Sequence, residues 1–221
     1  MVMIFDCFIF GQKERAILHL RIDTMCGTAE HTIISQGTTS LSGAAHTPFL
    51  DQADIAGLRA RCKTTALHVV LVETKHAYGS RKRYRSWHAL NHQSMALIIK
   101  ARQLGMRSSD LVLVTEHDEI PNPAFLHRLI ASNGMGHEPR TAKLRTAHYY
   151  VYHGACSGGY DWNAGFIANG AALDLLVDQR PNRQMFAIPK ANATTMWKPG
   201  VASSDSDRAH PLVVDNTPFL K

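Results

Sequence analysis

The stretch that decides the fold is Asp110-Leu-Val-Leu-Val-Thr-Glu-His-Asp-Glu-Ile-Pro121. Residues 110–115 form a nearly continuous apolar run, which is typical of a strand buried on both faces of a parallel sheet. The run ends at residues 116–119, which carry three carboxylates and an imidazole. Because ligands of open parallel sheets bind beyond the carboxyl ends of the strands, this stretch predicts a functional site directly after a buried strand.

Strands and helices alternate on both sides of this stretch. Strands are expected at residues 2–10, 31–36 and 66–73, and helices at 14–25, 54–61 and 87–104. Ser86 is expected to cap the last of these helices and Gly105 to end it. Asn122 and Pro123 are expected to open a further helix that runs to residue 130. The alternation predicts an α/β fold of Rossmann type, with a mainly parallel sheet covered by helices on both faces.

The pattern weakens after about residue 132. Residues 143–153 and 166–169 are expected strands, and 171–178 a short helix. Residues 158–163 are expected to form a Gly-rich loop, and from residue 179 the chain is rich in Pro, Asn, Asp and Ser. We therefore expect one α/β domain at 1–178 and an irregular C-terminal segment at 179–221.

Composition places the chain among globular proteins. It has 221 residues, of which 45% are hydrophobic and 19% charged, enough apolar surface for a core. No apolar run approaches the length of a membrane helix, and the apolar start carries Asp6 and no basic n-region, so a strand is expected there and not a signal peptide. We expect a cytoplasmic protein without a membrane span. The four cysteines (Cys7, Cys26, Cys62 and Cys156) form no Cys-x-x-Cys pair and are expected to be small buried hydrophobes without a function.

The net charge of +6 and the pI near 9.3 suit an anionic partner. The densest basic run is residues 81–85. Arg81 and Arg83 are therefore candidates for contacting an anionic nucleotide, and a solvated surface loop is the alternative.

The acids of residues 116–119 favour a hard divalent cation. Clustered carboxylates repel one another unless a cation or hydrogen-bond donors compensate them, and oxygen ligands suit Mn²⁺ or Mg²⁺. In a nucleotide-sugar transferase such an ion neutralises the charge that grows on the leaving diphosphate. The alternative is an acidic turn that caps the following helix.

Residues 114–121 resemble the Asp-x-Asp-Glu-Ile-Pro motif of glycosyltransferase family 17, which contains the β-1,4-mannosyl-glycoprotein 4-β-N-acetylglucosaminyltransferases. Further matches follow the family's order over roughly residues 2–125: residues 4–10 with Glu14 and Leu18-His19-Leu20-Arg21, residues 35–43, and Trp87 with Gln93. The chain departs from the family at Glu116, Gln36 and Ser94, where the family has Asp, Glu and Arg. It also has no clear counterpart of the family's C-terminal Gly-Trp-His segment.

The resemblance implies a GT-A fold, a UDP-sugar donor (UDP-N-acetylglucosamine first), a Mn²⁺ or Mg²⁺ ion, inversion at the anomeric carbon, and a glycan or other hydroxyl acceptor. Asp118 would be the main metal ligand, and Glu116 would contact the metal or the ribose. Glu119 would order the loop or assist catalysis.

The same resemblance implies a nucleotide pocket at the end of the first strand. Asp6, Phe8 and Glu14 would shape it, and Gln36 belongs to the matching loop after the next strand. Core packing is the alternative for Phe8. Arg21 is expected to pair with a neighbour on its own helix.

Inversion requires a general base for the acceptor hydroxyl, and Asp161 is the candidate because it lies beside aromatic residues that could stack on a sugar. An ordinary Asx-turn is the alternative. Two other functions remain open: a catalytically impaired sugar-nucleotide-binding relative, and a metal-dependent phosphoesterase or nuclease. The chain shows no second acidic cluster for a two-metal site, and nucleic acid is not an expected partner.

Overall fold

The computed structural model describes residues 1–11, 15–38, 45–73, 85–132, 134–143, 146–152, 155–162 and 165–179. Within these ranges, only the backbone is described for 85–89, 143, 146–152, 155–162 and 176–179.

The centre of the molecule is a six-stranded sheet with the order β3-β2-β1-β4-β8-β5. Its strands are β1 (Ile4–Ile9), β2 (His31–Gly37), β3 (Ala66–Val72), β4 (Leu111–Glu116), β5 (Thr141–Lys143) and β8 (Phe166–Asn169). The first four strands in this order pair in parallel, whereas β8 runs antiparallel to β4 and β5. The predicted α/β fold with a mainly parallel sheet is confirmed.

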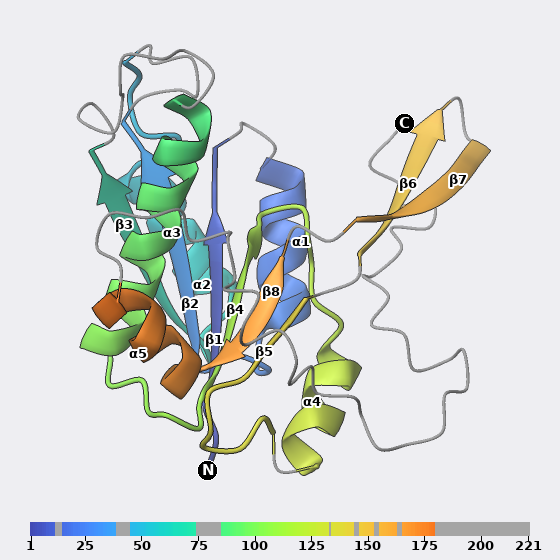
Figure 1. Cartoon of the computed structure of the whole chain (residues 1–221). Coiled ribbons are helices and arrows are strands. Elements are labelled where there is room, and N and C mark those ends of the chain that lie inside the picture. The colour runs from blue at the N-terminus through green and yellow to red at the C-terminus, as the bar shows by residue number, and fades with distance from the viewer. Residues whose placement is uncertain are drawn as a thin grey trace.

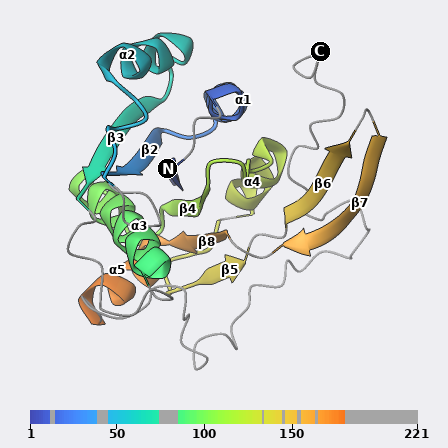
Figure 2. The ribbon, with the colours of Figure 1, turned by 90° about the horizontal axis from the view of Figure 1, so that it is seen from above.

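Helices cover both faces of the sheet (Figures 1 and 2). They are α1 (Arg15–Met25), α2 (Gln52–Arg61), α3 (Arg85–Gln103), α4 (Pro123–Ala131) and α5 (Gly170–Gln179). Strand β1 alternates between the two faces: Phe5, Cys7 and Ile9 share a buried cluster with α3, whereas Phe8, and Phe10 just after the strand, share one with α1 and α2. This alternation buries every residue of β1, as expected for the central strand of a sheet covered on both sides.

Local sequence explains where several helices begin and end. Asn122 caps α4 by accepting a hydrogen bond from the backbone of Ala124, with Pro123 as the first helical residue. Gly105, at φ +87°, follows the end of α3, as predicted. The prediction for Ser86 was wrong, because α3 already begins at Arg85.

The region between β5 and β8 differs from expectation. It forms a separate antiparallel ribbon of β6 (Thr146–Tyr152) and β7 (Ala155–Trp162), which projects beside the main sheet in Figure 1. Residues 158–163 were expected to be a loop, but residues 158–162 belong to β7. Pairing with β6 outweighs the weak strand propensity of Gly158 and Gly159, because tertiary context dominates β propensity.

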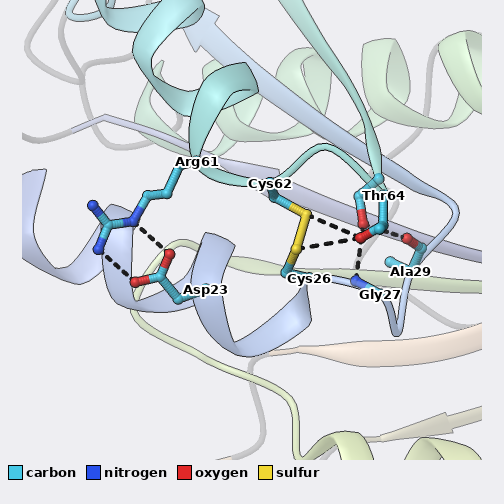
Figure 3. The surroundings of a disulfide bond; sticks show 8 residues. Asp23, Cys26, Gly27, Ala29, Arg61, Cys62 and Thr64 are labelled. Atoms are coloured by element: carbon cyan, nitrogen blue, oxygen red, sulfur yellow. Dashed lines mark hydrogen bonds and ion pairs between the residues drawn. A yellow bond between two sulfur atoms is a disulfide. The ribbon is translucent and has the colours of Figure 1, made fainter.

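A disulfide joins Cys26, just after α1, to Cys62, just after α2 (Figure 3). The expectation that these two cysteines are inert hydrophobes was wrong, because sequence alone does not reveal which cysteines pair across 36 residues. Closing a loop of this length contributes about 4 kcal/mol in the chain-entropy account. Cys7 is buried and free, and burial raises the pKa of its thiol.

The disulfide bears on the expected compartment. Such bonds persist mainly in oxidising environments and are rare in the cytosol, so the pairing argues against the cytoplasmic prediction. Among the helices of the described residues, none has the length and apolar character to cross a membrane.

Candidate functional site: an acidic turn at the carboxyl edge of the sheet

The acidic stretch lies where the strand order of the sheet reverses. From β1 the chain adds β2 and β3 on one side, and β4 then pairs with the other side of β1. Strand β4 ends at Glu116, opposite Ile9 near the end of β1. Ligands of open α/β sheets bind at this kind of switch point, outside the carboxyl ends of the strands.

Residues 116–119 alternate between solvent and the protein interior. Glu116 and Asp118 are exposed, whereas His117 and Glu119 are buried. The His117 ring packs edge-to-face on Phe10, with ring centroids 5.5 Å apart. The alternation therefore presents Glu116 and Asp118, the acid-x-acid pair, to solvent.

The turn is closed by a reciprocal pair of hydrogen bonds. The backbone N–H of Glu119 donates to the carbonyl oxygen of Glu116 over 3.2 Å. The backbone N–H of Glu116 donates to the Oε2 atom of Glu119 over 2.9 Å. Glu119 thus orders the loop, which is one of the two roles predicted for it.

A fully buried arginine of α1 holds the turn in place through hydrogen bonds. Arg21 donates from Nη1 to the carbonyl oxygens of Glu116 and Glu119, over 2.7 and 3.0 Å. Its Nη2 donates to the Oγ1 of Thr115 over 2.7 Å. Nη2 also donates to Asp6 Oδ1 over 2.5 Å and Nε to Asp6 Oδ2 over 3.2 Å. These contacts use all five N–H groups of the guanidinium, so helix α1 holds the acidic turn in one position.

These contacts correct three predictions about the end of the first strand. Asp6 is fully buried and paired with Arg21, so its carboxylate does not line a nucleotide pocket. Phe8 is also fully buried, with the Arg21 guanidinium 4.1 Å from its ring centroid, which confirms the core alternative. Arg21 pairs across the fold with a strand and a turn, and not with a helix neighbour.

Gln36 also has a structural partner. Its side-chain amide donates to the carbonyl oxygen of Leu50 and accepts from the Leu50 backbone N–H, over 3.2 and 3.0 Å. The side chain is buried and attaches the segment before α2 to the end of β2. These bonds engage the Gln36 amide within the protein, and a role for Gln36 in nucleotide binding stays a prediction.

Three predicted site residues, Glu14, Arg81 and Arg83, lie outside the described residues. Asp161 lies in β7, paired in register with Ala147 of β6. Its side chain is not described, so its role as general base stays a prediction.

Glu119 has an unusual environment. Burial raises its pKa to about 7; the Glu116 backbone N–H opposes this rise, and the charges of Glu116 and Asp118 add to it. Its Oε1 atom is buried and has no hydrogen-bond partner within the described ranges. Gly165, just before β8, comes so close that a Cβ there would lie 3.0 Å from Glu119 Oε2 and 2.7 Å from Thr115 Cγ2. The sequence pattern did not single out Gly165.

Other buried polar atoms that have no hydrogen-bond partner in the described part of the chain lie near the same edge. They lie near the end of β2 and in the first half of α3: Ser35 Oγ, Thr38 Oγ1, Asn91 Oδ1, Gln93 Oε1 and Ser94 Oγ. Native proteins leave few such atoms unsatisfied, and those that remain call for an explanation. Sequence reasoning did not assign a function to any of them except through family resemblance.

The acid-x-acid pair fits a cation that shares its coordination with a substrate. Within the described part of the chain, no three His, Cys, Asp or Glu side chains form a group able to hold a metal ion. Mg²⁺ typically uses one or two carboxylates together with water and substrate phosphates. Glu116 and Asp118 supply two exposed carboxylates on a fixed turn, which matches that donor set.

Comparison with known proteins adds no family assignment. No protein-family model matches the chain, and a search of curated proteins finds no match. Among solved structures, one similar fold is that of CMP:2-keto-3-deoxy-manno-octonic acid synthetase complexed with CTP, at 9% identity and a TM-score of 0.41, covering 82% of this chain and 79% of that one. A likeness of this size carries no argument about function.

Proposed function

We propose that this protein is a metal-dependent glycosyltransferase that moves a sugar from a nucleotide-sugar donor to a hydroxyl acceptor. The observation that carries the proposal is the rigid acid-x-acid turn at the switch point of a parallel sheet. Asp118 and Glu116 would hold the cation, which when bound would neutralise charge on the leaving diphosphate. The resemblance of residues 114–121 to glycosyltransferase family 17 favours UDP-N-acetylglucosamine as donor and a glycan as acceptor.

The protein's own contribution in this proposal is pre-organisation. Arg21 and Glu119 fix the turn before any ligand arrives, so the two exposed carboxylates need little rearrangement to bind. Fixed charges that are aimed in advance stabilise a transition state more effectively than groups that must reorient. In the transfer, the bond between the anomeric carbon and the diphosphate breaks, the acceptor oxygen bonds to that carbon, and Asp161 takes the hydroxyl proton.

The test is binding of UDP and UDP-N-acetylglucosamine with and without Mn²⁺, measured as a rise in melting temperature. Asp118→Asn keeps the size of the side chain but removes a charged oxygen ligand, and should abolish the Mn²⁺-dependent rise. Asp174→Asn is the matched control, since Asp174 is a partly exposed acid of α5 that pairs with Arg102. Equal Mn²⁺-dependent binding by wild type and Asp118→Asn would refute the proposal. A shift with DNA or RNA and none with any UDP-sugar would instead favour a nuclease.

A further inference from the structure

Four buried polar side chains come from β2 and from the first half of α3: Ser35, Asn91, Gln93 and Ser94, here called the polar layer. Their exposed fractions are 0%, 9%, 5% and 1%, and each has an oxygen without a hydrogen-bond partner among the described residues. Leaving a buried polar group unsatisfied costs about 1–3 kcal/mol. Several such groups on facing elements indicate a place where a ligand supplies the missing partners.

The polar layer lies at the carboxyl edge of the sheet. Along β2, Ser35 follows two residues after Ile33, which belongs to the same core cluster as Ile98 of α3. Helix α3 follows β3 and precedes β4, so it runs back from the carboxyl edge (Figure 1). Two strand residues advance about 6.7 Å and one helical turn about 5.4 Å. Ser94, one turn before Ile98, therefore lies near the level of Ser35, and Asn91 lies closer to the edge.

The polar layer lies beside the acid-x-acid pair. Ile9 pairs in register with Ser35 on one side and with Glu116 on the other. Neighbouring strands are about 4.8 Å apart, so the backbones of Ser35 and Glu116 are separated by about 10 Å, twice that spacing. One ligand can therefore reach both places.

The two places differ in chemistry. Glu116 and Asp118 carry charge, whereas the polar layer consists of two carboxamides and two hydroxyls. Amide oxygens accept hydrogen bonds, and hydroxyls both donate and accept. This set complements an uncharged, flat group with N–H and C=O atoms along one edge, which describes a nucleobase.

We infer that the polar layer binds the base of the nucleotide while the acid-x-acid pair serves its diphosphate. Asn91, the most exposed of the four, meets the base first, and Ser94 and Ser35 lie deeper. This inference rests on the proposed function for the identity of the ligand. Beyond that function, it identifies the nucleobase as the part of the ligand that is selected and the polar layer as the residues that select it.

The experiment is calorimetric titration with UDP and with inorganic pyrophosphate, each in the presence of Mn²⁺. Ser94→Val removes a hydroxyl and fills its space, and Asn91→Leu removes the carboxamide. Both variants should weaken UDP binding at least tenfold and leave pyrophosphate binding within twofold of wild type. Ser35→Ala provides a milder change in case a larger side chain prevents folding, which melting curves would reveal. Ser132→Val is the control, because the Ser132 hydroxyl at the end of α4 already donates to the carbonyl of Leu129.

The outcomes separate this inference from the proposed function. Unchanged UDP affinity in folded polar-layer variants overturns the base site, even if pyrophosphate still binds with Mn²⁺. Failure of pyrophosphate to bind with Mn²⁺ overturns the proposed function instead. Uridine, which has no phosphate, then tests the polar layer alone. Weaker uridine binding by Ser94→Val, together with wild-type uridine binding by Asp118→Asn, supports the base site. Equal uridine binding by both variants and wild type overturns it.

Discussion

The raised pKa of Glu119 makes a quantitative prediction about stability. A carboxyl group whose pKa is about 7 in the folded protein and near its ordinary value of about 4.3 when unfolded binds its proton more tightly in the folded state. Its stabilising contribution is therefore fully present below the unfolded value and is lost as the pH rises through about 7. At about 1.4 kcal/mol per pH unit, the difference between about 7 and about 4.3 amounts to a loss of roughly 4 kcal/mol.

Glu119→Gln should remove this loss. The glutamine oxygen can still accept the hydrogen bond from the Glu116 backbone N–H, and the side chain stays neutral at every pH. Near pH 4 the variant and wild type should unfold at similar urea concentrations. At pH 8 the variant should be more stable by up to about 4 kcal/mol, or roughly 8–16 °C in melting temperature for a domain of this size.

The assay is urea unfolding of both proteins from pH 4 to pH 8, followed by circular dichroism. The difference in unfolding free energy between the two proteins cancels the titrations that both share. These include the titrations of His31 and His68, whose pKa values are lowered mainly by burial. Glu138→Gln, at an exposed glutamate, controls for the loss of one negative charge. A difference between Glu119→Gln and wild type that is constant across this pH range would refute the reasoning.

Three further changes test the structure. Arg21→Met leaves the buried carboxylate of Asp6 without its partner and should cost about 3–5 kcal/mol of unfolding free energy; a cost below 1 kcal/mol would contradict the buried pair. Gly165→Ala places a methyl group against the end of β4 and should lower the unfolding free energy of the protein by about 1–3 kcal/mol. Gly57→Ala is its control: no described atom lies within 4 Å of the added carbon, so this change should stabilise α2 in the same melting experiment. Cys62→Ser should lower the unfolding free energy by about 4 kcal/mol. A reducing agent should lower the melting temperature of the wild type and leave that of the variant unchanged. If Cys62 were unpaired, the reducing agent would have no effect on the wild type either.

The fold was largely predictable because its central strands are buried on both faces. Such strands appear in the sequence as continuous apolar runs, and residues 110–115 were recognised on that basis. Strand β5, with three residues, is too short to show a period. Strand β7 was missed because its glycines and aspartate are turn residues by composition, and only its partner β6 makes them a strand.

The site was predictable only in part, for a different reason. Exposed acids after a buried strand are visible in the sequence, so Glu116 and Asp118 were found. The partner of Arg21 is not visible, because Asp6 lies 15 residues away on another element. The polar layer did leave a signal: Asn91 and Ser94 fall at helical spacing with Ile98 and Ala101, so two polar residues interrupt the apolar stripe that faces the sheet.

The residues that resemble the motifs of glycosyltransferase family 17 have two structural roles. Asp6, Arg21 and Glu119 are buried and bonded to one another or to the backbone of the acidic turn. Glu116 and Asp118 face solvent. Buried ionic groups cost free energy to desolvate, and the raised pKa of Glu119 is a direct sign of that cost. A core built only for stability would place apolar side chains there, so the arrangement is best explained by the need to hold two exposed carboxylates still.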